Sequence, residues 1–124
     1  MRLVERNPEG ELTLVNFDDD VPPYAILSHT WNIGEEVTFK EFVGSTGTST
    51  GNSAGKIKLG WAKIKFCGEQ AAEDGLRHFW VDTCCINKST SDELSTAINS
   101  MFRWYKNAAK CYVYLWQRRC IKRH

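Results

Sequence analysis

The stretch HFWVDTCCINK, residues 78–88, decides the fold, because it reads as a buried strand that runs into polar residues. Aromatic and β-branched side chains fill its first half, Gly75 lies before it and polar residues follow it, which is typical of a strand. The next segment, STSDELSTAINSMFRWYKNAAK, combines hydroxyl residues that can cap a helix with acidic residues in its first turn. Its apolar residues share one helical face, which comprises Leu94, Ala97, Ile98, Met101, Trp104 or Tyr105, and Ala108. We therefore predict a helix here, followed by a strand in KCYVYLW.

The same alternation of strand and helix lies upstream of this stretch. PPYAILSHTW begins with two prolines and continues apolar from Tyr24 to Leu27, which is the pattern of a central strand. Residues 57–71 carry apolar side chains at helical spacing, and Gly75 can end that helix. Weaker signals predict an edge strand in ELTLVNF and one or two helical turns in TFKEFV. The whole order predicts an α/β fold, in which a short parallel sheet with right-handed crossovers is flanked by helices.

Composition narrows the class of protein. The chain has 124 residues, of which 42% are hydrophobic and 25% charged, and this suits a single globular domain with its own core. The N-terminus lacks a signal-peptide pattern and no apolar run could span a bilayer, so we expect a protein of the cytosol or nucleus without membrane contact, and we take it as cytoplasmic. The basic residues form no stripe, which argues against nucleic acid as a partner. In a reducing compartment the five cysteines should be free thiols.

Two segments are expected to lie outside the packed core of this single domain. Residues 44–56, GSTGTSTGNSAGK, contain almost nothing apolar and predict a flexible internal loop. Residues 116–124, WQRRCIKRH, are predicted to form a basic tail.

Polar residues are expected to meet at the carboxyl edge of the sheet, where ligands bind in folds of this kind. His29 ends the first core strand and Asp82 lies in the second. An aspartate within an apolar run needs a partner, so Asp82 is either a structural support for loop amides or Thr30, or a site carboxylate that orients His29 or a ligand hydroxyl. His29 is in turn a general base, a ligand donor, or a loop histidine with satisfied hydrogen bonds.

The adjacent Cys84 and Cys85 leave three roles open. Strand alternation would point them to opposite faces and the chain has no C-x-x-C pair, which disfavours a metal site. A thiol nucleophile needs a lowered pKa, for which the nearby helix start would provide a cause. Packing is the favoured interpretation, as it is for the tryptophans, which could otherwise form an aromatic cage.

Three segments together resemble the fungal heterokaryon incompatibility (HET) domain. They are YAILSHTW with EVTF after it, KI..C.EQA..DGL..FWVDTCCI, and ELSTAINSMFRWYKNAAKCYVYL, and they cover about residues 21–115 in the order of the family. The resemblance implies a fungal protein of self/non-self recognition, a form of innate immunity in which the domain triggers programmed cell death. It also implies a flavodoxin-like sheet, because the family is distantly related to Toll/interleukin receptor (TIR) domains. The family continues beyond CYVYL, so the sheet is expected to be incomplete at its C-terminus and residues 116–124 to lie outside the family.

The expected site lies at the carboxyl edge of the sheet, where His29, Trp31 and the segment from Asp82 to Asn87 should converge. His29 and Asp82 are the expected catalytic residues. The expected ligand contacts are Ser28, Trp31, Cys85 and Asn87. Two of the family's positions differ here, since Asn32 replaces a glycine and Asn87 replaces an aspartate at the edge of the proposed site. We therefore predict an interaction module or an inactive fragment with protein partners, by self-association or with other HET-domain proteins, and with no metal and no cofactor. The alternative is a TIR-like hydrolase for which NAD is the substrate.

Overall fold

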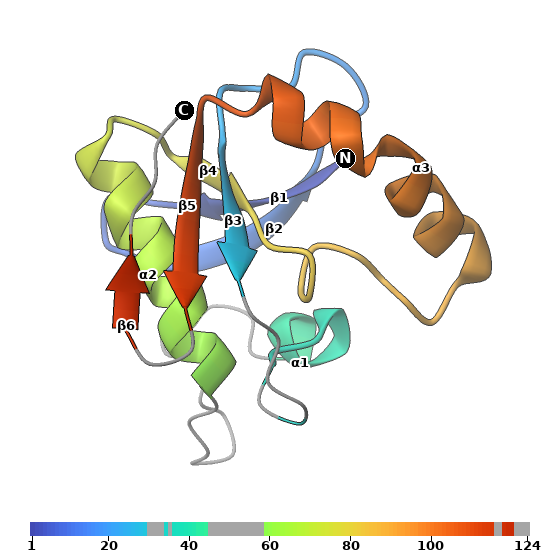
Figure 1. The fold of residues 1–124 in the computed structure, drawn as a ribbon, viewed down its shortest axis with the longest axis horizontal. Coiled ribbons are helices and arrows are strands. Elements are labelled where there is room, and N and C mark those ends of the chain that lie inside the picture. The colour runs from blue at the N-terminus through green and yellow to red at the C-terminus, as the bar shows by residue number, and fades with distance from the viewer. Residues whose placement is uncertain (30–33, 35, 45–58, 116–117, 121–124) are drawn as a thin grey trace.

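The computed structural model describes residues 1–29, 34, 36–44, 59–115 and 118–120, and its helices and strands between residues 12 and 115 follow the predicted order (Figure 1). The strands are β1 (Arg2–Arg6), β2 (Leu12–Asn16), β3 (Ala25–His29), β4 (His78–Trp80), β5 (Lys110–Leu115) and β6 (Arg118–Cys120). The helices are α1 (Phe39–Gly44), α2 (Leu59–Glu73) and α3 (Ser91–Asn107). Apart from Gly44, the predicted flexible loop lies outside the described residues. Among the described residues, no helix is both long and apolar enough to cross a membrane.

The six strands form one open sheet in the order β2-β1-β4-β3-β5-β6. Its centre is parallel, because β3 pairs in parallel with β4 on one side and with β5 on the other, which confirms the predicted α/β core. Antiparallel strands extend the sheet at both edges. The predicted edge strand β2 is present, but β1, for which the sequence predicted no strand, lies between it and β4. At the other edge β6 pairs with β5, within the segment expected to be a basic tail.

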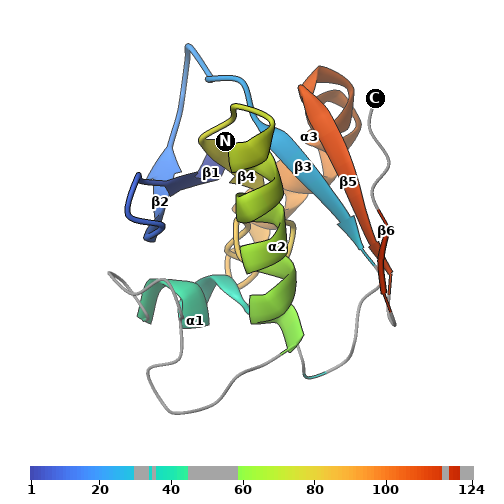
Figure 2. The same ribbon diagram turned by 90° about the vertical axis from the view of Figure 1, so that its left-hand side faces the viewer.

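Helices α2 and α3 cover opposite faces of the sheet, so the domain has three layers (Figure 2). On the α2 face, the hydroxyl group of Tyr112 donates to Asp74 Oδ2 at 2.5 Å. On the α3 face, the Trp80 ring packs edge-on against Trp104 with 5.5 Å between ring centres. Helix α1 lies beyond the carboxyl end of β3, at the edge where a site was expected (Figure 1).

Strand β4 is shorter than the sequence predicted. It ends at Trp80, and the backbone N–H of Cys85 then donates to the carbonyl oxygen of Val81 at 2.9 Å, which closes a turn. Cys84 and Cys85 therefore lie in this turn and do not alternate across a strand. Both are buried, as are Val81 and the residues between Asp82 and Asn87. The apolar run reflects burial of the turn, which periodicity cannot distinguish from a buried strand.

Helix α3 is amphipathic as predicted, but its buried face is narrower. Ala97 and Ser100 are buried against the sheet, whereas Ile98, which was assigned to the buried face, is 62% exposed. Thr90 occupies the N-cap position without a side-chain hydrogen bond to the helix. Asp92 and Glu93 in the first turn still place negative charge at the positive end of the helix dipole.

Candidate functional site

The carboxyl ends of β3 and β4 bring the two predicted catalytic residues together. His29 is the last residue of β3, and Asp82 lies in the turn directly after β4. The Nε2 atom of His29 is 2.9 Å from Oδ1 of Asp82. This contact agrees with a carboxylate that orients His29, which is one of the roles considered for Asp82. The catalytic role of both residues stays a prediction.

A lysine and a glutamate that the sequence did not single out extend this pair. Lys63 on α2 places its Nζ atom 3.0 Å from Nδ1 of His29 and donates to Oε2 of Glu36 at 2.7 Å. The other carboxylate oxygen of Glu36 lies 3.8 Å from the same ring nitrogen. We call these four residues, Glu36, Lys63, His29 and Asp82, the polar relay. Their side chains are 9%, 1%, 2% and 20% exposed, so Asp82 is the member nearest to solvent.

Of the two relay members that the sequence did not single out, Lys63 could have been predicted from it. Lys63 lies one helical turn before Cys67 and next to Ile64, on the face of the predicted helix that carries the apolar residues. A lysine at such a position is rarely buried without a partner. Glu36 gives no comparable signal, because it lies in an irregular segment before α1.

Hydrogen-bond chemistry determines where the protons of the polar relay lie. A lysine ammonium group can only donate, so Nδ1 of His29 accepts from Lys63. A neutral imidazole then carries its proton on Nε2 and donates it to Asp82. The relay therefore runs as carboxylate, ammonium, neutral imidazole, carboxylate. Because Lys63 and Glu36 are buried, removing the ammonium group of Lys63 leaves the Glu36 carboxylate without its counter-charge, and breaking a buried ion pair in this way costs about 3–5 kcal/mol in proteins.

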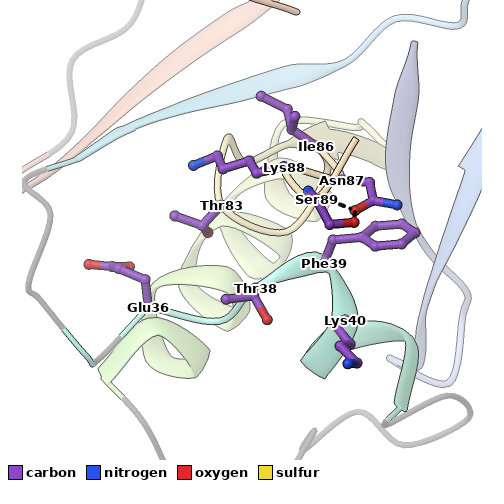
Figure 3. A pocket seen from close by; sticks show the side chains of 9 residues that line it. All are labelled: Glu36, Thr38, Phe39, Lys40, Thr83, Ile86, Asn87, Lys88 and Ser89. Carbon is purple, nitrogen blue, oxygen red and sulfur yellow. Dashed lines mark hydrogen bonds between the residues drawn. The ribbon is translucent and has the colours of Figure 1, made fainter. Parts of the chain in front are cut away.

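A pocket of about 540 Å³ opens beside the polar relay, between α1 and the segment that follows β4 (Figure 3). Its lining residues are Glu36, Thr38, Phe39, Lys40, Thr83, Ile86, Asn87, Lys88 and Ser89. Glu36 belongs to both the pocket and the polar relay. A molecule in the pocket would therefore lie against the residue whose carboxylate accepts the hydrogen bond from Lys63.

The pocket also offers positive charge and an aromatic ring. The Lys88 side chain passes above Thr83, on the side of the pocket where Glu36 lies (Figure 3). Partial burial lowers the pKa of Lys88, while the nearby carboxylates of Asp82 and Glu36 act in the opposite direction. Lys40 adds a second ammonium group and Phe39 a phenyl ring.

Arg2 contacts Phe39, which forms part of the pocket wall. Its guanidinium carbon lies 4.6 Å from the centre of the Phe39 ring. The same guanidinium group forms a two-point ion pair with Glu93 and donates to the carbonyl oxygen of Cys85 at 3.3 Å. Its hydrogen bonds lower the pKa of Glu93. One guanidinium group thus joins β1, α1, the turn after β4, and α3.

Asn87, one of the predicted ligand contacts, lines this pocket. Its Oδ1 atom accepts hydrogen bonds from the Ser89 backbone N–H at 3.2 Å and from Ser89 Oγ at 2.5 Å (Figure 3). Its backbone N–H donates to Oε2 of Glu93 at 2.8 Å. Asn87 therefore shapes the segment between the turn and α3 as well as facing the pocket.

Two other predicted contacts, Ser28 and Cys85, do not line the pocket. Ser28 alternates with His29 along β3 and is hydrogen-bonded to Tyr105 of α3, on the opposite face of the sheet. Burial raises the pKa of Tyr105 to about 12. Cys85 is buried, and its Sγ atom accepts from the backbone N–H of Val81 at 3.4 Å. Trp31 lies outside the described residues.

The structure also bears on the roles considered for the adjacent cysteines. Burial raises the pKa of the Cys84 thiol well above its ordinary value, with smaller contributions from Cys85 and Asp82. This environment opposes a thiolate nucleophile. Among the described residues, no group of three or more His, Cys, Asp or Glu side chains could hold a metal ion.

Comparison with known proteins identifies related sequences. A family model described as "Heterokaryon incompatibility protein (HET)" matches residues 24–122. The chain is 53% identical over 118 residues to "Vegetative incompatibility protein HET-E-1" of Podospora anserina. This alignment covers 93% of the chain and 8% of the relative, so the chain spans only a small part of that protein's length. No solved structure matches significantly.

Proposed function

Because this chain belongs to the heterokaryon incompatibility (HET) family, we propose that it acts in fungal self/non-self recognition, as a cytoplasmic domain that triggers cell death after incompatible cells fuse. The match over residues 24–122 supports this role, as does the 53% identity to a vegetative incompatibility protein. That relative is a much longer protein, and this chain matches 8% of its length.

The effector chemistry that the geometry supports best is a reaction on a nucleotide in the pocket, with NAD as the substrate. One observation carries this part of the proposal, namely that Glu36 joins the pocket to the buried polar relay. In hydrolysis of the bond between nicotinamide and ribose, positive charge develops on the sugar, and a fixed carboxylate stabilises it. Lys40 and Lys88 would pair with the diphosphate and Phe39 would stack on a base.

The polar relay has a defined task in this proposal. Lys63 fixes the Glu36 carboxylate at 2.7 Å, and His29 and Asp82 fix Lys63 through the chain of hydrogen bonds. Glu36 would be the residue that faces the reacting sugar. His29 and Asp82 would be positioning residues, because their hydrogen bonds reach the pocket through Lys63. Water attacks the ribose carbon, nicotinamide leaves with the bonding electron pair, and the proton of the water passes to solvent.

The test is nicotinamide release from NAD by the purified chain, followed by chromatography. We expect Glu36→Gln to lower the rate at least ~100-fold, because the developing charge loses its carboxylate. Glu73→Gln makes the same chemical change on the exposed surface of α2, outside the pocket lining, and should leave the rate unchanged. Circular dichroism and thermal melting must show that both variants are folded. A wild-type chain that releases no nicotinamide, or an active Glu36→Gln variant, would overturn this chemistry.

A second candidate is an effector that works by self-association without catalysis. The observation that favours it is the apolar surface of α3, where Ile98 is 62% and Phe102 is 80% exposed. Exposed apolar residues that lie together are typical of interaction surfaces. Absence of nicotinamide release together with a mass that increases with concentration would select this candidate over the first.

A further inference from the structure

Helix α3 exposes an apolar surface that no described part of the chain covers. Ile98 and Phe102 lie one helical turn apart and point away from the face that packs on the sheet. Ser91, Ser95, Ile98 and Phe102 follow one another at intervals of four, three and four residues. This spacing aligns side chains along one helix, as in the contact line of a coiled coil. We call these four residues the α3 seam.

We propose that the α3 seam binds the α3 seam of a second copy of this chain, with the two helices antiparallel around a two-fold axis. This inference rests on the self-association form of the proposed function and names the surface that would be used. A two-fold axis requires a self-complementary patch, so the sizes and charges of the two ends of α3 must match each other.

The two ends of the α3 seam are complementary in size. Its first half carries the small side chains of Ser91 and Ser95, and its second half carries the large ones of Ile98 and Phe102. In an antiparallel pair, Phe102 of one copy faces the serine end of the other, and Ile98 lies near the axis. A parallel pair would instead place the two phenylalanines against each other and leave empty space between the serines.

The charges beside the α3 seam are complementary in the same arrangement. Asp92 lies near the start of the helix, and Lys106 lies near its end on the same flank of the seam, where both are exposed. In a two-fold antiparallel pair each flank meets the same flank of the partner, so Asp92 faces Lys106 of the other copy. The opposed helix dipoles add to this attraction. In a parallel pair each flank would meet the opposite flank of the partner, so Asp92 and Lys106 would not meet.

Sedimentation velocity across the micromolar range tests the proposal. We expect the wild-type chain to dimerise and Phe102→Asp to raise the dissociation constant at least ~30-fold, as loss of a central aromatic contact does. Val43→Asp makes the same kind of change on α1, where Val43 is 46% exposed, and should have no effect. Lys106→Glu should weaken the dimer about threefold to tenfold. Adding Asp92→Lys to Lys106→Glu should restore it, because the pair of charges is then exchanged and not lost.

Each outcome has a defined meaning. Restoration of the dimer in the exchanged variant supports the antiparallel arrangement, since a merely destabilised helix would not recover. A wild-type chain that stays monomeric overturns both this surface and the self-association form of the function, without bearing on nicotinamide release. A dimer that is insensitive to Phe102→Asp and Lys106→Glu overturns the α3 seam alone and leaves self-association in place.

Discussion

Replacing Lys63 by methionine tests whether the polar relay is the electrostatic centre of this domain. Methionine keeps most of the volume of the lysine stem and removes the ammonium group. The Lys63 side chain is 1% exposed and its partner Glu36 is 9% exposed, so water cannot replace the lost donor. Both Oε2 of Glu36, at 2.7 Å, and Nδ1 of His29, at 3.0 Å, lose that donor.

We expect Lys63→Met to lower the free energy of unfolding by about 3–5 kcal/mol, the usual effect of breaking a buried ion pair. In a domain of this size the melting temperature should fall by roughly 10–20 °C. Urea unfolding followed by tryptophan fluorescence measures the change. The double variant Lys63→Met with Glu36→Gln should recover part of the loss, because the buried carboxylate that paired directly with Lys63 is then neutral. A loss below about 1 kcal/mol, or a double variant less stable than either single one, would refute the relay as described.

Three further predictions concern other parts of the molecule. Arg2 lowers the pKa of Glu93, so their pairing stabilises the fold above the ordinary pKa of 4.5, and this contribution is lost as the pH falls through the lowered value. Urea unfolding at a series of pH values should therefore show that the free energy of unfolding falls less in acid for Glu93→Gln than for the wild type. The same dependence on pH in both proteins would contradict this. Gly68→Ala would place a Cβ atom 3.2 Å from Cε1 of the fully buried Phe79, so we expect a net loss of about 1 kcal/mol despite the better helix propensity of alanine. An unchanged melting temperature would show that the ring can move aside. Burial raises the pKa of Cys67 and Cys84, so iodoacetamide at mildly alkaline pH should label them only in denaturant, and rapid labelling of native Cys84 would restore the case for a thiol nucleophile.

The parallel core could be predicted because its signals are local. Gly75 ends α2 with a φ of +81°, as its position after the apolar periodicity indicated. The elements that the sequence did not predict depend on pairing with residues far away in the chain. Strand β1 gains its place by pairing with both β2 and β4, and nothing in RLVER alone indicates this. The C-terminal end of β4 was predicted wrongly because a buried turn and a buried strand have the same apolar composition.

The candidate site was predictable in part, for the same reason. His29 and Asp82 could be paired because each follows a core strand and parallel strands end at one edge. Lys63 and Glu36 come from a helix and an irregular segment, and the interaction that joins them exists only after α2 packs on the sheet. The exposure of Ile98 depends on the tilt of α3 against its sheet, which the helical period does not determine.

The pairing of β1 with β4 also sets an order of events during synthesis. Val4 pairs with Phe79 and Glu5 with His78, so the first strand leaves the ribosome long before its neighbour exists. At ~5–20 residues per second this interval lasts roughly 4–15 s. Meanwhile the hairpin of β1 and β2 is marginally stable and presents an open strand edge that other nascent chains can reach. The yield of folded protein should thus depend on how soon residues 78–80 follow, which synonymous codons can change without altering any contact in the finished domain.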